Sequence, residues 1–445
     1  AVLTVNTIPV FTTHPQSQAV AFGGTATFTA LATSSPAPSY QWQKDNVNLP
    51  GQTGTTLTIA GVNSGSTGVY TCVAISLAGQ TSSNGAGLNT TNSPPAPISQ
   101  PVVQQTVMSG SSVTLTFNVS GTPTPSIQWY KDGAAVPGAT GATYTLTASK
   151  ANSGTYTASA INSTGTITSS PAYLGVMVPS RLVNVSTRAA AGSGAQTLIA
   201  GFVISGGSKS ILVRGVGPGI AQYFPAGTTL ADPALNILDG STSVAANEDW
   251  GGATALKNVF NQVGAFALTD TSKDAAINAT LAGNKVYSAT LSGSGGGLAI
   301  AEIYDADTSD IPAGRLVNLS TRTQVGTGTG VLIAGFVITG DFPKQVLIRA
   351  IGPTLGQYGV PGVLADPQLD LYVAGASTPM LSNDNWGGTA ALTTAFNQVG
   401  AFALPDANSK DAAILVTLNP GSYSAIVSGV GNTSGVALVE VYDVQ

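Results

Sequence analysis

Two stretches of the sequence place oxygen-bearing side chains directly before a Trp-Gly-Gly turn. Residues 247–250 read Asn-Glu-Asp-Trp and residues 383–386 read Asn-Asp-Asn-Trp. Ca²⁺ takes six to eight oxygen ligands, and carboxylates and side-chain amides supply them in proteins. The weak candidates for calcium ligands are therefore Asn247, Asp249, Asn383 and Asp384. The spacing matches no EF-hand loop, and Asx turns use the same residue types, so turn capping is the alternative.

Four aromatic residues at matching places in the sequence could form a surface on which a sugar stacks. They are Trp250, Trp386, Tyr223 and Tyr358. An aromatic ring offers a flat apolar face to the apolar face of a pyranose. The same residues could instead close one end of a β-sandwich, so surface glycans are a possible partner and burial is the alternative.

The residues that catalysis uses most often are scarce in this chain. One histidine, His14, and one cysteine, Cys72, cannot form a His-containing triad or a Cys/His metal cage. Glu302 and Asp305 resemble an acid/base pair, but nothing places a second group at a fixed distance from them. The glycine-rich residues 293–297 are followed by neither a helix nor a lysine, as phosphate binding would require. We predict that the protein is not an enzyme and has no cofactor other than possible calcium.

The charge of the chain is low and slightly acidic. Fifteen Lys and Arg residues against 20 Asp and Glu residues give a net charge of −5, and charged residues make up 8 % of the sequence. A typical soluble domain has about 25 %. Such a chain neutralises few phosphates, which argues against nucleic acid as a partner. No run of about 18 apolar residues occurs, so we expect no membrane insertion.

Alternation of apolar residues with Thr and Ser predicts half-buried β-strands. Residues 25–29 (Thr-Ala-Thr-Phe-Thr) and 113–117 (Val-Thr-Leu-Thr-Phe) show this pattern. The alternating polar face is neutral, so such surfaces repel one another weakly and can associate over large areas. In a chain with so few charges, we expect Arg214 and Arg349 to pair across strands with Glu302 and Glu440. The pattern predicts an all-β protein.

A repeat in the first part of the chain carries a Trp motif followed by a Tyr motif. Residues 40–45 (Tyr-Gln-Trp-Gln-Lys-Asp) return as residues 127–132 (Ile-Gln-Trp-Tyr-Lys-Asp), an offset of 129 − 42 = 87 between the tryptophans. Residues 66–72, with Gly-Val-Tyr-Thr-Cys, return as residues 152–158, with Gly-Thr-Tyr-Thr-Ala, an offset of 156 − 70 = 86.

These paired motifs resemble immunoglobulin-like domains of the I-set kind over about residues 8–177. The resemblance implies that Trp42 and Trp129 are buried strand-C tryptophans and that Tyr70 and Tyr156 form tyrosine corners. All four would then belong to the structural core. It also implies two packed β-sheets in each domain.

The cysteines depart from the immunoglobulin pattern. Cys72 stands at the strand-F position, but its strand-B counterpart is Ala30, and the second domain has Phe117 and Ala158 there. Both domains must therefore hold their sheets together by packing, at a loss of roughly 2–4 kcal/mol each relative to a bridged domain. We expect Cys72 to behave as a small buried apolar residue.

A second, unrelated repeat fills the rest of the chain. Residues 181–188 (Arg-Leu-Val-Asn-Val-Ser-Thr-Arg) return as residues 315–322, an offset of 322 − 188 = 134, and residues 260–266 return as residues 396–402. Strands dominate this repeat, and apolar residues at Leu256, Val259, Phe260 and Val263 predict one short helix. It resembles a repeat found beside immunoglobulin-like domains in large secreted proteins of environmental bacteria, which implies an extracellular or cell-surface location.

The chain begins with what looks like the last strand of an absent domain. Each immunoglobulin-like domain ends in an Ala-x-Leu strand, at residues 86–90 and 172–176, and the leucines at 3 and 88 repeat the domain period (88 − 3 = 85). A lone strand must fray, fold back or pair with a foreign sheet edge. Pairing with another molecule is β-strand donation. The predicted polymer interface is Ala1, Val2, Leu3, Thr4 and Val5.

Together these features predict a row of β-sandwich modules, two immunoglobulin-like and two larger β-rich repeats with one short helix each. The predicted segments are a donor-strand-like extension (1–7), two immunoglobulin-like domains (8–92 and 93–177) and two repeat modules (178–312 and 313–445). The predicted function is that of a structural subunit of an extracellular bacterial filament, a homopolymer assembled head to tail by strand donation. The alternative is a monomeric adhesin or carbohydrate-binding surface protein.

Overall fold

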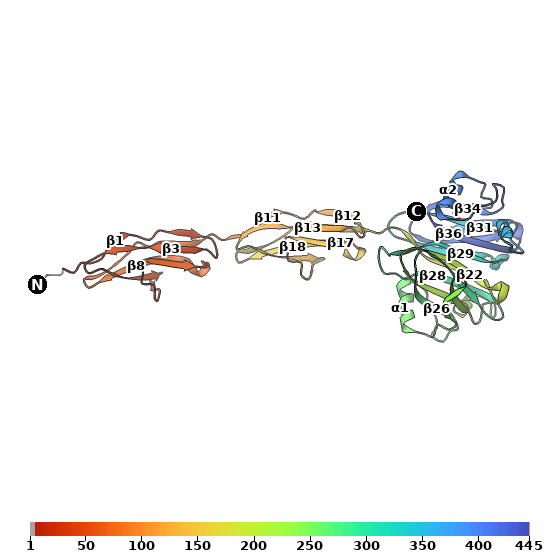
Figure 1. Ribbon diagram of the computed structural model, residues 1–445, viewed down its shortest axis with the longest axis horizontal. Helices are drawn as coiled ribbons and strands as arrows, with labels where there is room; N and C mark the ends of the chain where they lie inside the picture. The colour runs from red at the N-terminus through yellow and green to blue at the C-terminus, as the bar shows by residue number, and fades with distance from the viewer. Residues whose placement is uncertain (1–4, 445) are drawn as a thin grey trace. The chain divides into compact units, whose positions relative to one another are not determined.

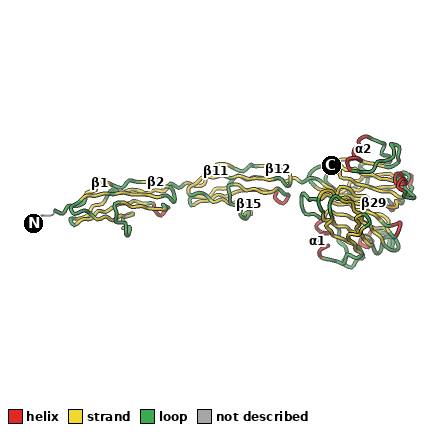
Figure 2. The backbone as a smooth tube through the Cα atoms, viewed as in Figure 1, coloured by secondary structure: helices red, strands yellow, loops and turns green. Residues whose placement is uncertain are grey.

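A computed structural model of the chain describes residues 5–444 and consists mainly of β-strands joined by turns (Figures 1 and 2). The chain divides into two compact units. The first contains the residues as far as 107 together with 111–176, and the second contains residues 108–110 and 177 onward. The prediction of an all-β fold with tandem immunoglobulin-like sandwiches is confirmed.

The first immunoglobulin-like domain is built from short strands and one 3-10 turn, η1 (Ser64–Ser66). Its strands are β1 (Val10–Thr13), β2 (Gln18–Val20), β3 (Thr25–Thr29), β4 (Leu31–Thr33), β5 (Ser39–Lys44), β6 (Val47–Asn48), β7 (Thr56–Ala60), β8 (Gly68–Ser76), β9 (Gly79–Ser82) and β10 (Ala86–Thr90). One sheet has the order β2-β10-β8-β5-β6, with β9 also paired to β8. The pairs β1-β4 and β3-β7 face it.

The second domain repeats this arrangement, with η2 (Lys150–Asn152) in place of η1. Its strands are β11 (Ser93–Ser99), β12 (Gln104–Met108), β13 (Ser112–Thr116), β14 (Asn118–Thr122), β15 (Ser126–Lys131), β16 (Ala134–Ala135), β17 (Thr143–Thr147), β18 (Gly154–Asn162), β19 (Gly165–Thr168) and β20 (Ala172–Met177). The main sheet has the order β12-β20-β18-β15-β16. The topology therefore matches strand for strand, as the repeated motifs require.

The two tryptophans and two tyrosines that the repeat singled out lie in the cores of these domains. Trp42 and Trp129 are fully buried, and Tyr70 and Tyr156 are at most 2 % exposed. The Tyr70 hydroxyl donates to the Ser66 carbonyl at 2.7 Å, and the Tyr156 hydroxyl makes the matching bond at 2.8 Å. Each indole N–H also donates to a backbone carbonyl at 2.9 Å. These bonds satisfy the polar atoms that the cores would otherwise bury unpaired.

No disulfide can replace this packing in the first domain, because Cys72 is a free, buried thiol. Cys72 and Ala30 are both fully buried and belong to the same apolar cluster. Burial raises the pKa of Cys72 to about 11, so the thiol stays protonated at neutral pH and is a poor nucleophile.

The shared burial of these two positions predicts that Ala30→Cys will form a disulfide with Cys72. The bridge restricts the unfolded chain, so we expect the first domain to gain about 2–4 kcal/mol of unfolding free energy. Denaturant unfolding with and without a reductant measures the gain, and the wild-type chain under the same reductant is the control. A free thiol at both positions after oxidation contradicts the prediction.

The second unit begins with the first copy of the long repeat. Its strands are β21 (Arg181–Ala191), β22 (Leu198–Gly206), β23 (Lys209–Val216), β24 (Ala234–Asp239), β25 (Thr242–Asn247), β26 (Ala275–Leu281), β27 (Lys285–Ser292) and β28 (Gly297–Asp305). Its helical segments are η3 (Gly194–Gln196), η4 (Pro218–Tyr223) and α1 (Thr254–Val263). The predicted helix is α1, and Phe260 is its buried residue.

The second copy repeats these elements in the same order. Its strands are β29 (Gly314–Val325), β30 (Leu332–Thr339), β31 (Lys344–Ile351), β32 (Pro367–Val373), β33 (Leu381–Asn383), β34 (Ala412–Leu418), β35 (Gly421–Gly429) and β36 (Gly435–Asp443). Its helical segments are η5 (Gly328–Gly330), η6 (Pro353–Tyr358), α2 (Ala390–Val399) and η7 (Val430–Asn432). Both α1 and α2 end at a glycine in the left-handed conformation, Gly264 (φ 70°) and Gly400 (φ 69°).

Strands of the two copies join in one 16-stranded sheet, in which the two central strands of the main path each lie among strands of the other copy. Its order is β25-β24-β27-β22-β29-β21-β30-β35-β32-β33, which is symmetric about the central β29 and β21. The strand β22 of the first copy pairs with β29 of the second, and β21 pairs with β30 in the same way. Figure 1 shows β22, β28 and β29 crossing the middle of this unit.

Equivalent residues meet where the copies join, as a pseudo-two-fold relation requires. Leu182 pairs with Leu316, and the Thr187 and Thr321 hydroxyls share a buried hydrogen bond of 2.8 Å. Both pairs are separated by the repeat offset of 134 residues. The two copies therefore pack like the halves of a symmetric dimer that are covalently joined.

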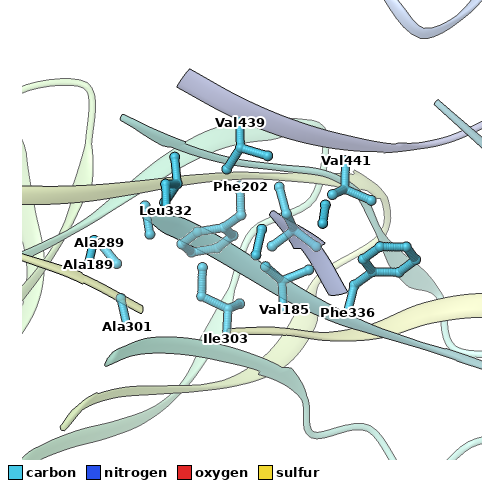
Figure 3. Close-up of a cluster of buried hydrophobic side chains, with 14 of the residues drawn as sticks. Val185, Ala189, Phe202, Ala289, Ala301, Ile303, Leu332, Phe336, Val439 and Val441 are labelled. Carbon is cyan, nitrogen blue, oxygen red and sulfur yellow. The ribbon is translucent and has the colours of Figure 1, made fainter. Parts of the chain in front are cut away.

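One apolar core serves both copies, as the close-up in Figure 3 shows. Val185, Phe202 and Ile303 come from the first copy, and Phe336 and Val441 come from the second. This corrects the expectation of two free-standing modules, 178–312 and 313–445, placed one after the other. The boundary between the copies stays a prediction, but neither copy closes its sheet or its core without the other, because each central strand finds a partner in the other copy.

The shared sheet predicts that residues 178–312 alone will not be a folded monomer. Removing the second copy leaves the edges of β21 and β22 unpaired and exposes one side of the core. We expect this fragment to dimerise or aggregate, and to fold when residues 313–445 are added. Analytical ultracentrifugation and circular dichroism check this, with the intact 178–445 unit as the control. A stable monomeric fragment with a cooperative unfolding transition contradicts it.

Candidate functional site

Two buried ion pairs lie at equivalent places in the two copies, and each holds a loop that bears an aromatic residue. Arg349 on β31 faces Glu440 on β36, and the guanidinium Nε lies 2.8 Å from the carboxylate. The first copy has Arg214 and Glu302 in the same register at 2.7 Å. Both arginines are fully buried. The expected pairing across strands is thus present, and it neutralises charges that could not be buried alone.

Each ion pair extends into a polar and aromatic cluster. The Tyr442 hydroxyl donates to Glu440 at 2.8 Å. Burial, followed by the Glu440 charge, raises the pKa of Tyr442, so this hydroxyl remains a donor at neutral pH. Arg349 Nη1 donates to the Phe402 carbonyl at 2.6 Å, and its guanidinium lies 4.3 Å from the centre of the Phe402 ring. The buried arginine therefore fixes the position of Phe402.

Phe402 in turn supports an exposed tyrosine. The Tyr358 ring packs edge-on against Phe402, with 5.5 Å between ring centres. Tyr358 ends η6, and the buried Asp411 accepts the Gly352 N–H at 2.7 Å where that turn begins. Asp411 also accepts the Thr354 hydroxyl. The exposed Tyr358 ring thus packs against Phe402, and the buried Asp411 anchors the start of the turn that carries it.

Two adjoining cavities share Ile199 and Arg322, and Tyr358 lines one of them. One, of about 550 Å³, is lined by residues of both copies, among them Ile199, Ser288, Ser320, Arg322, Tyr358 and Phe402. The other, of about 590 Å³, is lined by residues that include Gln196, Thr197, Ile199, Arg322 and Gln324. We call the two together the Arg322 groove, because both contain Arg322 and Ile199. It is the candidate functional site.

The residues predicted to bind calcium are engaged with the protein itself. Asn247 accepts the Ala276 N–H at 2.9 Å and donates to the Asp249 carbonyl, and Asn383 makes the same bonds at its equivalent position. The Asp249 carboxylate pairs with Lys273 at 2.9 Å, while Asp384 is exposed. Turn capping therefore accounts for both asparagines. Calcium binding stays a prediction, and it would have to displace the Lys273 contact.

The four aromatic residues proposed for sugar stacking separate into two classes. Trp250 and Trp386 are buried at 3 % and 8 % exposure, where they pack against Phe260 and Phe396. Tyr223 and Tyr358 are 73 % and 64 % exposed. The tryptophans close the ends of the two aromatic clusters, as the alternative to stacking required, and only the tyrosines present a ring to solvent.

The predicted polymer interface falls almost wholly outside the described residues. Ala1, Val2, Leu3 and Thr4 are not described, and Val5 is 64 % exposed and belongs to no strand. Thr7 already bonds within the first domain, where its N–H donates to the Ser35 carbonyl at 2.9 Å.

Arg322 and Asp411 were not among the functional residues predicted from the sequence. Each lies in a repeated motif: Ser-Thr-Arg occurs at residues 186–188 and 320–322, and Ser-Lys-Asp occurs at 272–274 and 409–411. The repetition of these motifs therefore marked both residues in the sequence. A repeated motif can, however, contain a structural residue or a binding residue. Burial separates them, because Asp411 is fully buried and Arg322 is exposed.

The fold defines a protein with tandem immunoglobulin-like domains and an additional β-rich unit. Residues 8–75 and 96–176 each match an immunoglobulin domain family. Protein sax-3 from Caenorhabditis elegans is 34 % identical over 192 residues, which cover 37 % of this chain and 15 % of that protein. Roundabout homolog 3 from Homo sapiens is 32 % identical over 37 % of this chain and 14 % of its own length.

Two further proteins are similar to this chain. Cell adhesion molecule Dscam2 from Drosophila melanogaster is 34 % identical over 30 % of this chain and 7 % of its own length. A crystal structure of titin domains z1z2 in complex with telethonin is 33 % identical over 39 % of this chain and 98 % of that chain, with a TM-score of 0.28. The chain thus spans at most about a seventh of these three curated relatives.

These comparisons correct the predicted function. The relatives are animal proteins that include a named cell adhesion molecule, so the prediction of a bacterial filament subunit assembled by strand donation is wrong. The findings favour the alternative, an adhesion protein, and are consistent with the cell surface. The resemblance of the second repeat to bacterial secreted proteins finds no support in them. Among residues 5–444, no helix is long and apolar enough to cross a bilayer.

The buried ion pair predicts a large effect of Glu440→Gln on stability. The substitution leaves the Arg349 charge buried without a carboxylate, which costs about 3–5 kcal/mol. Denaturant unfolding of the full chain measures the loss, and Glu302→Gln should behave alike. The exposed Glu248→Gln is the matched control. A loss no larger than that of Glu248→Gln contradicts a structural role for the pair.

Proposed function

We propose that this chain belongs to an extracellular, non-enzymatic adhesion protein whose immunoglobulin-like domains contact a protein on another cell. The observation that carries the proposal is the similarity of both domains to those of sax-3, the Roundabout homologs and the cell adhesion molecule Dscam2. Because the chain covers a small part of each relative, the partner and the activity are inferred and not transferred.

An uncharged sheet face in each domain supports this function. Side chains alternate along β5, β8, β15 and β18, so those opposite the core share one outer face. In the first domain this face carries Gln41, Gln43, Val69, Thr71, Val73 and Ile75. In the second it carries Gln128, Tyr130, Thr155, Thr157, Ser159 and Ile161.

Apolar side chains on these faces are open to solvent. Ile75 is 41 % exposed and Ile161 is 52 % exposed, at equivalent positions of the two domains. A face without charged residues loses little free energy when a partner desolvates it, and exposed aliphatic groups gain free energy on burial. Both properties suit a protein interface of moderate affinity.

The double variant Ile75→Lys/Ile161→Lys tests this function on the full chain. Two lysines would have to be buried unpaired in the interface, so we expect attachment of suspended animal cells to a surface coated with the protein to fall at least about tenfold, or about 1.4 kcal/mol. Attachment is counted after a fixed shear wash at equal coating density.

The matched control is Leu31→Lys/Ile98→Lys. These residues are 46 % and 70 % exposed on β4 and β11, outside the two faces, so the control adds the same charge elsewhere. Equal attachment by both double variants would place the contact outside the faces. No attachment of cells by the wild-type chain would refute the adhesion function.

A further inference from the structure

The Arg322 groove contains a cation that the protein leaves uncompensated. Arg322 is exposed, and among the described residues no carboxylate forms an ion pair with it. No acidic residue is among those that line the two cavities. Arg214 and Arg349, in contrast, are buried and paired with Glu302 and Glu440.

The first copy of the repeat shows what a closed version of this site looks like. Arg188 is equivalent to Arg322, and its guanidinium lies 5.5 Å from the centre of the Phe224 ring. The ring covers the cation and occupies the space beside it. Phe224 follows Tyr223 at the end of η4, at the position that Gly359 occupies after Tyr358 in η6. The pseudo-symmetric sites therefore differ at the residue that stacks on the arginine.

Gly359 has no side chain that could cover Arg322. Its φ is +75°, and a Cβ built on it would meet no heavy atom within 4 Å. Without a ring at this position, Arg322 and Tyr358 both line the groove. The Tyr358 ring packs edge-on against Phe402.

The remaining lining combines apolar side chains, such as Val286 and Leu438, with hydroxyl and amide side chains that suit a ligand rich in hydroxyl groups. Ser288 and Ser320 lie on the Tyr358 side of Arg322, and Gln196, Thr197 and Gln324 lie on the other side. Hydroxyl and amide side chains donate and accept hydrogen bonds, as sugar hydroxyls do. The exposed tyrosine ring offers an apolar face for a pyranose. The guanidinium can bind a carboxylate with two parallel hydrogen bonds.

We propose that the Arg322 groove binds an acidic oligosaccharide containing hexuronic acid. Arg322 pairs with the carboxylate of one residue, Tyr358 stacks under the neighbouring pyranose, and the chain of sugars continues past Arg322 into the second cavity. The two adjoining cavities make the site long enough for more than one sugar. The site lies in the C-terminal unit, so it is independent of the adhesion faces proposed for the immunoglobulin-like domains.

Titration calorimetry of the full chain at low salt tests the proposal with three probes. These are tetrasaccharides of galacturonic acid, of mannuronic acid, and of glucuronic acid alternating with N-acetylglucosamine. We expect at least one to bind, Arg322→Gln to weaken that binding at least about tenfold because a charged bidentate contact is lost, and Tyr358→Ala to weaken it several-fold. The methyl ester of the same probe, which has the same rings and no charge, should bind as weakly as the acid binds to Arg322→Gln.

The equivalent residues of the first copy provide matched controls. Arg188→Gln and Tyr223→Ala remove the same groups from the site that Phe224 closes, and we expect them to change affinity less than twofold. The proposal is overturned if none of the three acids binds, if the methyl ester binds equally well, or if Arg188→Gln weakens binding as much as Arg322→Gln. Unfolding midpoints equal to the wild type confirm that each variant is folded.

Discussion

Antiparallel pairing of β21 and β29 with strands of the opposite copy is the constraint on which the C-terminal unit depends. Each strand hydrogen-bonds to a strand of its own copy and to one of the other, so the two copies fold as one sheet around one core. This joining also creates the Arg322 groove. One wall comes from β22 and β27 of the first copy and the other from β29 and η6 of the second, so neither copy contains the site alone.

Some charged residues of the chain are buried in ion pairs, and others are exposed to solvent. Lys209, Arg214 and Arg349 are fully buried and paired with carboxylates of neighbouring strands. The two arginines also donate to the backbone carbonyls of Phe266 and Phe402. Arg322, in contrast, is exposed, and none of the described residues that line the two cavities beside it is acidic.

The immunoglobulin-like domains stabilise their cores by aromatic packing. Phe28 stacks on Tyr70 with 5.0 Å between ring centres in the first domain, and Tyr144 packs beside Trp129 and Tyr156 in the second. Aromatic packing and hydrogen-bonded tyrosine corners replace the inter-sheet disulfide. Their outer faces carry no charge, which leaves them free to meet another protein over a broad area.

The sequence alone determined three features of the fold. Alternation of apolar and hydroxyl residues determined the all-β class, the Trp and Tyr motifs determined the immunoglobulin-like cores, and helical spacing of apolar residues determined α1. Each of these patterns is a local property of the sequence. The sequence did not determine that strands pair between the two copies. Equivalent strands have the same local pattern whether they pair within one copy or between copies. The site depended on tertiary structure in the same way. Equivalent arginines, Arg188 and Arg322, have the same motif, and although the sequence shows Phe224 in one copy and Gly359 in the other, only the folded chain brings these residues beside the arginines.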